Sequence, residues 1–469
     1  MFLGIDKIEG CRLAAIDDQG SQITYGELAE CAQSLQAVIP KRSIVFLLCK
    51  NTVGALTAYI SMVENEIVPV TLNDSIDAEL FRVLVETYRP QYICVDSTRA
   101  AEYPYKVVYE KNGYSYLLTG YPAYPINDQL ELLMTTSGST GSPKLVRYKK
   151  GNLEANAKNV ALAWGWTSQE RPICDLMMNY TMGLNVINTH LYVGATLLLV
   201  TYNITDARYW KFIKEHEATN FTGVPFSYDI LWKLRFPRMD MPYLTTLSEG
   251  GGKLSDKMFL AVAEYARDKG KRFIASFGTT ETSARLAMLE PEMALEKMGS
   301  IGRAIPEGEL VLFDENGDEI RDSEAEGELG YRGPNVTMGY ALSPDDLLKG
   351  DEFCGLYKTG DIARRDKDGY YYIVGRMSRF LKMLGHRVSL DQCERLIRDK
   401  FGMDCACGGT DEKMKIFIVS DENEDDIKRY ISDKIGIYSS MFQVVRVDEI
   451  PRNSTGKVLY KQLQEPERI

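Results

Sequence analysis

The chain has 469 residues, of which 45% are hydrophobic and 26% are charged. A chain of this size buries a large core, and its length predicts two or more lobes rather than one. The net charge of −11 argues against a nucleic-acid-binding surface as the main feature, so we expect no nucleic-acid partner. Only three histidines are present, which excludes a histidine-rich metal centre.

The amino terminus lacks a basic flank followed by a long apolar run, and the longest apolar stretch, around Ala195 to Val200, is too short to span a bilayer. We therefore expect no membrane span and a cytoplasmic location. The nine cysteines are scattered and form no CxxC pair typical of zinc sites. Cys405 and Cys407 form a CxC pattern, which we interpret as strand residues that face one side.

Apolar bursts at residues 43–49 and 90–96 alternate with helical patterns at residues 25–39 and 78–88. The same alternation returns between residues 195 and 278. Strands that alternate with helices predict crossover units and a largely parallel sheet. The expected fold class is therefore α/β, with a large amino-terminal body of mainly parallel sheets and flanking helices.

After about residue 295 the pattern changes to short strands punctuated by glycine, which predicts a β-rich subdomain at about 296–375. Beyond this segment, two helical patterns and two apolar strands predict a small α+β carboxy-terminal domain. We expect a large domain of residues 1–375, a small mobile domain of residues 376–469, and a hinge between them.

A cluster of small hydroxyl residues and glycines, MTTSGSTGSPK at residues 134–144, directly follows two apolar residues. Small residues let the backbone approach an anion, while N–H groups, hydroxyls and a lysine contact phosphate oxygens. The spacing is not that of a Walker loop, because Lys144 follows a proline. Taken alone, such a cluster is also common in ordinary surface loops.

Residues 137–144 match every position of the phosphate loop [ST]SG[ST]TGxPK, and the chain here resembles the adenylate-forming superfamily of acyl-CoA synthetases, firefly-type luciferases and nonribosomal adenylation domains. The resemblance continues in chain order through nearly the whole sequence. The further matching segments are Ile23 to Leu28, Asn179 to Leu184, Glu249 to Gly252, Phe277 to Glu281, Gly299 to Arg303, Gly327 to Pro334, Tyr357 to Asp361, Gly375 to Arg376, Lys382 to Arg387 and Pro451 to Lys457.

The resemblance implies adenylation of a carboxylate by ATP with Mg²⁺, followed by acyl transfer to a thiol. It assigns catalysis to Lys457, Thr280 and Glu281, with Glu281 as the metal ligand. It assigns nucleotide binding to Thr136, Ser137, Gly138, Ser139, Thr140, Gly141, Lys144, Gly250, Gly251, Phe277, Gly278, Thr279, Asp361, Arg376, Lys382 and Gly385. The competing interpretations are a core position for Phe277 and an ordinary interdomain salt bridge for Arg376.

The same resemblance implies a substrate pocket formed by Tyr180, Thr181, Phe221, Val224 and Gly252. Tyr180 either orients a substrate hydroxyl or merely packs. The thiol acceptor is either coenzyme A or the phosphopantetheine of an acyl or peptidyl carrier protein, because both present the same arm. In the resembling enzymes the small domain turns between the two steps and brings residues 382–387 to the thiol.

Two positions depart from the family pattern. Ser378 stands where the hinge usually carries Asp or Lys, and Asn179-Tyr180 replaces the Phe-Asp pair of amino-acid-activating members, which argues against an α-amino acid substrate. Two alternatives stay open: a ligase that forms an amide or ester from the same acyl-AMP, and a nucleotide-binding relative without catalysis. The second is disfavoured by five charged residues that a silent relative has no chemical reason to keep, namely Lys144, Glu281, Asp361, Arg376 and Lys457.

Overall fold

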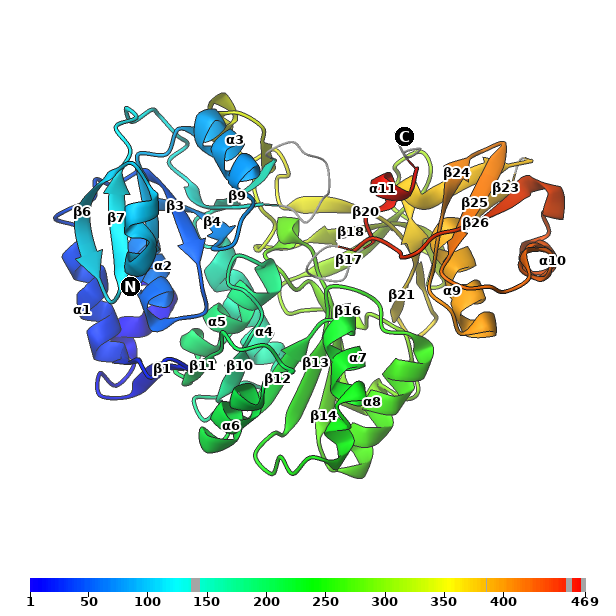
Figure 1. Cartoon of the computed structure of the whole chain (residues 1–469), viewed down its shortest axis with the longest axis horizontal. Helices are drawn as coiled ribbons and strands as arrows, with labels where there is room; N and C mark the ends of the chain where they lie inside the picture. Colours follow the sequence, from blue (N-terminus) through cyan, green and yellow to red (C-terminus); the bar gives the residue numbers. More distant parts are fainter. Residues whose placement is uncertain (136–143, 385, 453–457, 465–469) are drawn as a thin grey trace. The chain divides into compact units, whose positions relative to one another are not determined.

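The computed structural model describes residues 1–135, 144–384, 386–452 and 458–464. Contacts group the chain into two compact units (Figure 1). Unit 1 contains residues 1–309 and 331–357, and unit 2 contains residues 310–330 and 358–469. The boundary expected near residue 375 is the point at which the small domain is predicted to turn. The division by contacts does not test this movement, so the boundary stays a prediction.

A nine-stranded sheet forms one half of unit 1. Its strands lie in the order β16 (Arg303–Ala304), β15 (Ala287–Leu289), β14 (Arg272–Phe277), β13 (Thr246–Glu249), β12 (Asn220–Gly223), β10 (Pro172–Cys174), β11 (Leu197–Leu199), β1 (Leu13–Asp17) and β2 (Gln22–Thr24). The run from β14 to β1 is parallel, whereas both edges are antiparallel. The carboxyl ends of β12, β13 and β14 therefore lie at one edge of the sheet, where ligands bind in open α/β sheets.

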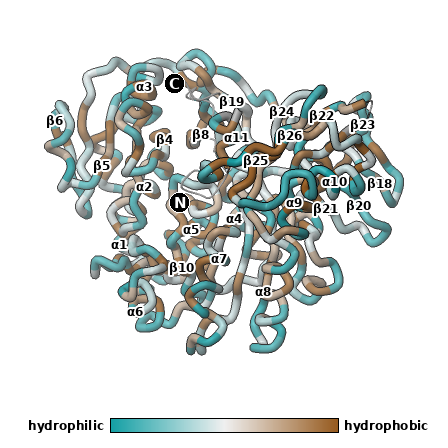
Figure 2. The backbone as a smooth tube through the Cα atoms, turned by 45° about the vertical axis from the view of Figure 1, so that its right-hand side comes forward, coloured by the Kyte–Doolittle hydropathy of each residue, from teal (hydrophilic) through white to brown (hydrophobic). Residues whose placement is uncertain are grey.

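Helices connect these strands, as the alternating pattern predicts. They are α4 (Asn152–Trp164), α5 (Thr181–Tyr192), α6 (Ala207–Glu215), α7 (Pro225–Lys233) and α8 (Asp256–Asp268). Ser255 caps α8 by accepting a hydrogen bond from the N–H of Met258. Along α8 the backbone in Figure 2 alternates between hydrophobic and hydrophilic residues, and its buried residues are Phe259, Val262, Ala263 and Ala266.

The other half of unit 1 is an eight-stranded sheet. Its strands lie in the order β19 (Tyr340–Ala341), β9 (Leu145–Lys149), β8 (Leu130–Thr135), β4 (Val68–Asn73), β3 (Ile44–Cys49), β5 (Tyr92–Asp96), β7 (Tyr114–Leu118) and β6 (Lys106–Lys111). The four middle strands are parallel and the edges are antiparallel. The expectation of mainly parallel sheets is confirmed for the middle of both sheets.

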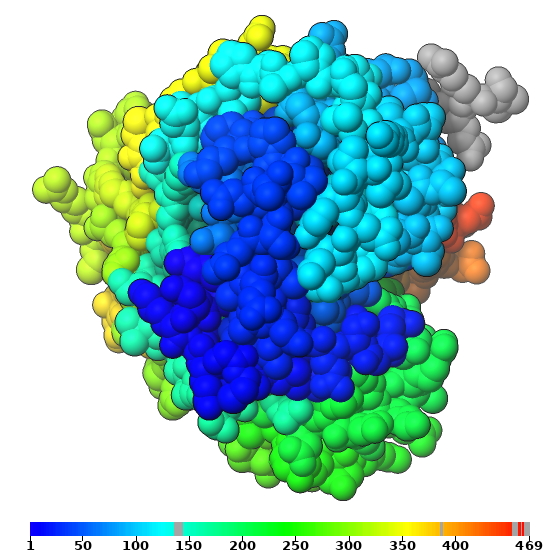
Figure 3. Space-filling model, turned by 90° about the vertical axis from the view of Figure 1, so that its left-hand side faces the viewer, coloured from blue at the N-terminus to red at the C-terminus, as the bar shows by residue number. Residues whose placement is uncertain are grey.

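Three helices accompany this sheet, namely α1 (Tyr25–Leu35), α2 (Val53–Glu64) and α3 (Ala78–Tyr88). On the face shown in Figure 3, the N-terminal segment lies beside the hairpin of β6 and β7. The hydroxyls of Ser34 and Tyr109 are 2.8 Å apart across this contact.

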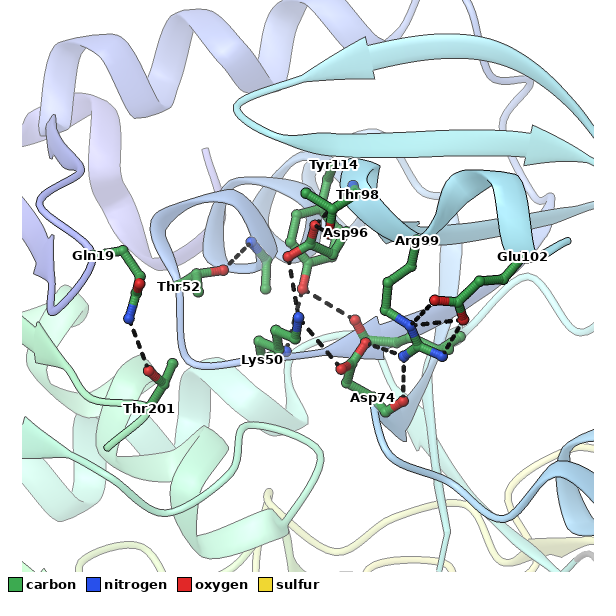
Figure 4. A network of polar contacts seen from close by, with 12 residues as sticks. Gln19, Lys50, Thr52, Asp74, Asp96, Thr98, Arg99, Glu102, Tyr114 and Thr201 are labelled. Atoms are coloured by element: carbon green, nitrogen blue, oxygen red, sulfur yellow. Dashed lines mark hydrogen bonds and ion pairs between the residues drawn. The ribbon is translucent and has the colours of Figure 1, made fainter. Parts of the chain in front are cut away.

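An ion-pair network holds the carboxyl ends of β3, β4 and β5 together (Figure 4). Lys50 Nζ lies 3.5 Å from Asp74 Oδ2 and 3.2 Å from Asp96 Oδ2. Arg99 Nη1 lies 2.7 Å from Asp74 Oδ1, and its Nη2 lies 2.8 Å from Glu102 Oε2. Because every charge in this network is matched by a partner, we interpret it as structural.

The described residues of unit 2 form three further sheets. They are formed by β17 (Glu309–Phe313), β18 (Ala325–Arg332), β20 (Leu356–Arg365) and β21 (Tyr371–Arg376); by β22 (Phe380–Met383) and β23 (His386–Ser389); and by β24 (Cys405–Thr410), β25 (Lys413–Ile418) and β26 (Phe442–Arg446). Its helices are α9 (Leu390–Phe401), α10 (Glu424–Ile435) and α11 (Tyr460–Gln464). Cys405 and Cys407 share one buried cluster, whereas Ala406 belongs to another, which confirms that the two thiols face one side.

Short 3₁₀ helices complete the chain: η1 (Phe2–Lys7), η2 (Ser97–Glu102), η3 (Phe236–Arg238), η4 (Thr280–Thr282), η5 (Pro291–Met293), η6 (Pro344–Leu348), η7 (Met377–Arg379) and η8 (Ser439–Met441). Within the described ranges, no helix has the length and apolar character needed to cross a membrane.

Candidate active site

The turn after β14 is the most constrained segment near the carboxyl edge of the nine-stranded sheet. A Cβ atom on Gly278 would lie 1.3 Å from the backbone oxygen of Ala284, so only glycine fits there. Ser283 and Ala284 have φ angles of 57° and 101°, which are unusual for residues with a side chain. Strained backbone of this kind concentrates at functional sites, and this turn carries Glu281.

Tyr340, on β19 of the eight-stranded sheet, contacts two charged residues that were predicted from the sequence to belong to the site. Its hydroxyl donates a hydrogen bond to Glu281 Oε1 at 2.7 Å, and the Nζ of Lys144 lies 3.3 Å from the centroid of its ring. Burial, and then the charge of Glu281, raise the pKa of the Tyr340 phenol, so it stays a donor at neutral pH. Tyr340 could not be assigned to the site from the sequence, because it stands alone between the matching segments.

Thr280 is held from two sides. The hydroxyl of Tyr148 donates to its backbone carbonyl oxygen at 2.8 Å, and the hydroxyl of Thr181 donates to its Oγ1 at 3.1 Å. The Thr280 hydroxyl keeps its own hydrogen for donation, which suits contact with an anion. The structure thus brings together Thr181, predicted for the acyl pocket, and Thr280, predicted for catalysis.

Glu281 is better suited to bind Mg²⁺ together with a nucleotide than to be part of a metal centre built from several protein ligands. Among the described residues there is no group of three or more Asp, Glu, His or Cys side chains able to hold a metal ion. Mg²⁺ needs only one or two protein carboxylates, since phosphates and water supply its remaining ligands. A single carboxylate oriented by Tyr340 is therefore a suitable donor set for Mg²⁺ bound to a nucleotide.

The glycine segment after β13 leaves room for the Tyr180 phenol. Gly251 has a φ of 76°, and a Cβ on it would lie 2.3 Å from the Tyr180 hydroxyl oxygen and 3.4 Å from Val224. A Cβ on Gly252 would lie 3.1 Å from the ring of Pro225. The structure therefore brings together Tyr180, Val224, Gly251 and Gly252, all predicted site residues. 

Phe221 lies on β12 and is buried, with its ring centroid 5.8 Å from that of Tyr228. A Cβ on Gly223 would lie 2.7 Å from the Phe221 ring. Phe221 therefore contributes packing beneath the carboxyl end of β12, and a direct contact with substrate stays a prediction.

Glu249 and Arg285 form a second polar group that sequence reasoning did not assign to the site. Burial raises the pKa of Glu249 to about 8 and lowers that of Arg285 to about 9. Burial also raises the pKa of Tyr180, while the charge of Arg285 acts in the opposite direction. The motif that contains Glu249 was recognised for its glycines, and Arg285 lies in no matching segment.

In unit 2, the predicted nucleotide ligands Asp361 and Arg376 lie opposite each other on β20 and β21. Arg376 Nε donates to Asp361 Oδ1 at 3.2 Å. The Asp361 side chain is 5% exposed, whereas that of Arg376 is 66% exposed. Burial raises the pKa of Asp361 and Arg376 lowers it, so the arginine helps to keep this buried carboxylate charged.

Around the expected hinge, Ser378 lies in η7, and the neighbouring Arg379 is bound to Asp391 and Glu394. Lys382 is exposed on β22, and its backbone N–H donates to Asp411 at 2.8 Å. Eight predicted site residues lie outside the described residues: Thr136, Ser137, Gly138, Ser139, Thr140, Gly141, Gly385 and Lys457.

Comparisons with known proteins show the family and the fold of the chain. A family model described as "AMP-binding enzyme" matches residues 9–341. Oxalate–CoA ligase of Arabidopsis thaliana is 26% identical over 346 residues, which cover 71% of this chain and 66%, just under two thirds, of that enzyme. The 2-succinylbenzoate–CoA ligase of Bacillus subtilis is 26% identical over 352 residues, 73% of this chain and 70% of the relative.

A solved structure shows the same fold. The O-succinylbenzoate coenzyme A synthetase (MenE) from Bacillus subtilis, in complex with ATP and a magnesium ion, superposes with a TM-score of 0.80 at 21% identity and covers 98% of both chains. The expected α/β fold class is thereby confirmed. Since the family model covers well over half of the sequence, the chain belongs to the AMP-binding enzyme family.

Proposed function

We propose that this ligase makes an acyl-CoA thioester, and that Glu281, Thr280, Lys144 and Lys457 organise its first half-reaction. The observation that carries the proposal is the contact of Tyr340 with both Glu281 and Lys144. Through Tyr340, Glu281 of the turn after β14 and Lys144 next to β9 lie around one side chain, although they are far apart in the sequence. Phosphoryl and adenylyl transfer gain chiefly from such positioned charges.

In the first half-reaction, a substrate carboxylate oxygen attacks the α-phosphorus of ATP. A phosphorus–oxygen bond forms to give acyl-AMP, and pyrophosphate leaves with the bonding electron pair. Thr280 donates its hydroxyl hydrogen to an α-phosphate oxygen, and Lys144 places its charge near the outer phosphates. Glu281 would hold Mg²⁺, which would neutralise part of the phosphate charge.

The nucleotide contacts in unit 2 are assigned from the chemical properties of the side chains. Asp361 accepts hydrogen bonds from the two ribose hydroxyls, for which an ionised carboxylate with two acceptor oxygens is suited. Arg376, which is mostly exposed while bound to Asp361, contacts the nucleotide. Lys457 neutralises the attacking carboxylate and the α-phosphate, and the small domain then turns about the segment that contains Ser378.

In the second half-reaction, a thiol sulfur attacks the acyl carbon, AMP leaves with the electron pair, and the thiol loses its proton. Coenzyme A is the proposed acceptor because both curated relatives reported above are named as CoA ligases. A carrier-protein phosphopantetheine presents the same arm and is the second candidate. We place the enzyme in the cytosol, since all nine cysteines are free, as expected in a reducing compartment.

The test supplies enzyme, ATP, Mg²⁺ and pooled carboxylic acids with one acceptor at a time: coenzyme A, a phosphopantetheine-loaded carrier protein, or an amine. Mass spectrometry of the products identifies the acceptor. A thioester of coenzyme A supports the proposal. A carrier-bound thioester or an amide would replace coenzyme A as the acceptor, and ATP binding without product in any arm would revive the non-catalytic alternative.

A further inference from the structure

Arg285 lies deep within unit 1 with most of its donor capacity unused. The residue is 3% exposed, and its Nη1 donates to Asn185 Oδ1. Its Nε and Nη2 have no hydrogen-bond partner among the described residues. A buried guanidinium with two unsatisfied N–H groups destabilises the folded protein, so its presence needs a physical reason.

The backbone and the ring beneath Arg285 hold it in place. Its carbonyl oxygen accepts from the side-chain amides of Asn156 at 2.7 Å and Asn335 at 3.4 Å. The guanidinium carbon lies 4.4 Å from the centroid of the Trp164 ring. Ala284, the residue before Arg285, has a strained φ of 101°. The turn after Glu281 thus places the Arg285 side chain in the interior.

The Arg285 guanidinium lies near residues of the proposed acyl pocket. Its charge acts on Tyr180, whose hydroxyl oxygen packs over Gly251. Its partner Asn185 lines a narrow internal space together with Thr181, which donates to Thr280. Arg285 thus acts electrostatically on one predicted pocket residue, Tyr180, and binds Asn185, which shares an internal space with another, Thr181.

The charge of Arg285 is not cancelled by its acidic neighbour. Glu249 is buried at the end of β13, and its Oε1 has no hydrogen-bond partner among the described residues. Burial raises the pKa of Glu249 and so favours its neutral form, whereas a guanidinium stays cationic at neutral pH. The pair then carries a net positive charge, and both members have unused polar atoms.

We propose that Arg285 binds a second acidic group of the substrate, so that the enzyme adenylates one carboxylate of a dicarboxylic acid while the guanidinium holds the other. The inference rests on the proposed adenylation and specifies its substrate class. Two adjacent N–H donors in a planar group match the two oxygens of a carboxylate, which an ammonium does not do. An uncharged substrate end would leave these donors unsatisfied, which is how a site of this kind rejects analogues.

The experiment measures ATP–pyrophosphate exchange with matched acid pairs, in which each dicarboxylic acid is compared with its own monomethyl ester. The pairs include succinate, glutarate and phthalate, so that length and shape vary independently of charge. We expect wild-type enzyme to prefer at least one diacid over its monoester by about a hundredfold in kcat/KM. Arg285→Gln should remove that preference by lowering exchange with the diacid while sparing the monoester.

Arg272→Gln is the matched control, because Arg272 also contacts the Trp164 segment, by donating from Nη2 to the Trp164 carbonyl oxygen. It should leave the preference unchanged. Arg285→Lys keeps the charge without the planar pair of donors, so it should restore the preference only in part, and it replaces Arg285→Gln if that variant does not fold. Thermal unfolding of each variant checks the fold.

A preference for monoesters in wild-type enzyme, or equal loss of diacid and monoester exchange in a folded Arg285 variant, would overturn the inference. Either result leaves the proposed adenylation standing, since exchange itself is observed. Silence with every acid would instead contradict the proposed function. The two failures are therefore distinguishable in the same assay.

Discussion

The hydroxyl of Tyr340 lies 2.7 Å from Glu281 Oε1, and this hydrogen bond joins the edge strand β19 of the eight-stranded sheet to the turn after strand β14 of the nine-stranded sheet. The two residues are 59 positions apart in the sequence. Because the same tyrosine ring carries Lys144 on its face, it sets the separation of an acidic and a basic group at the proposed phosphate site.

Tyr340→Phe removes this hydrogen bond and keeps the ring. We expect kcat/KM for ATP to fall by about tenfold to a hundredfold, as for a lost hydrogen bond to a charged group, and half-saturating Mg²⁺ to rise. Exchange assays at graded Mg²⁺ concentrations measure both. Tyr109→Phe is the control, because it removes a hydroxyl contact on β6, at the opposite edge of the same sheet. Equal effects of the two substitutions would contradict the role of Tyr340.

Gly278→Ala tests the close approach within the turn. Its Cβ would overlap the backbone oxygen of Ala284, so the turn must open. We expect a loss of about 2 kcal/mol or more in the free energy of unfolding, together with loss of activity. Gly350→Ala has no atom within 4 Å of its added Cβ and should change neither quantity. Denaturant titration decides the matter, and unchanged stability of Gly278→Ala would refute the turn geometry.

Glu249→Gln tests the protonation state of the buried acid. Burial raises the pKa of Glu249 to about 8, so the folded state favours the protonated form. Its stabilising contribution is complete below the ordinary carboxyl pKa and is lost as pH rises through about 8. Glutamine stays neutral, so the variant should gain stability relative to wild type between pH 5 and pH 9, by a few kcal/mol at about 1.4 kcal/mol per pKa unit.

Unfolding titrations at pH 5, 7 and 9 measure this difference. Glu264→Gln replaces an exposed glutamate of α8 and serves as the control, for which we expect a flat difference with pH. A flat difference for Glu249→Gln as well would mean that Glu249 is ionised in the folded protein and neutralises Arg285.

Asp361→Asn tests the ribose contact. The amide retains one acceptor and adds a donor, so KM for ATP should rise by about tenfold or more. Stability should not fall, because burial already raises the pKa of this carboxyl and thus disfavours its charge. Asp399→Asn, an exposed position of α9, is the control. An unchanged KM for ATP with intact turnover would remove Asp361 from the nucleotide site.

The sequence predicted elements well where the local pattern was complete. The helical pattern at residues 78–88 coincides with α3, whereas the pattern at residues 25–39 ends earlier, with α1 at Leu35. Pro40 disfavours helical geometry at the residue before it, so the apolar residues Val38 and Ile39 pack after a turn instead.

Short motifs in the sequence point to part of the candidate site, as in the turn with Thr280 and Glu281. Tyr340 and Arg285 could not be found in this way. Each is a single residue whose partners come from another strand or helix, so its role depends on contacts that no local pattern encodes. Asn185, for example, lies 100 positions from Arg285 in the sequence.

The most direct test of the account is ATP–pyrophosphate exchange with Mg²⁺ and pooled carboxylic acids, with no thiol present. The account predicts exchange that depends on Mg²⁺ and on one class of acid, because acyl-AMP forms before the thiol is needed. Folded enzyme that binds ATP but exchanges no pyrophosphate with any pool would contradict it.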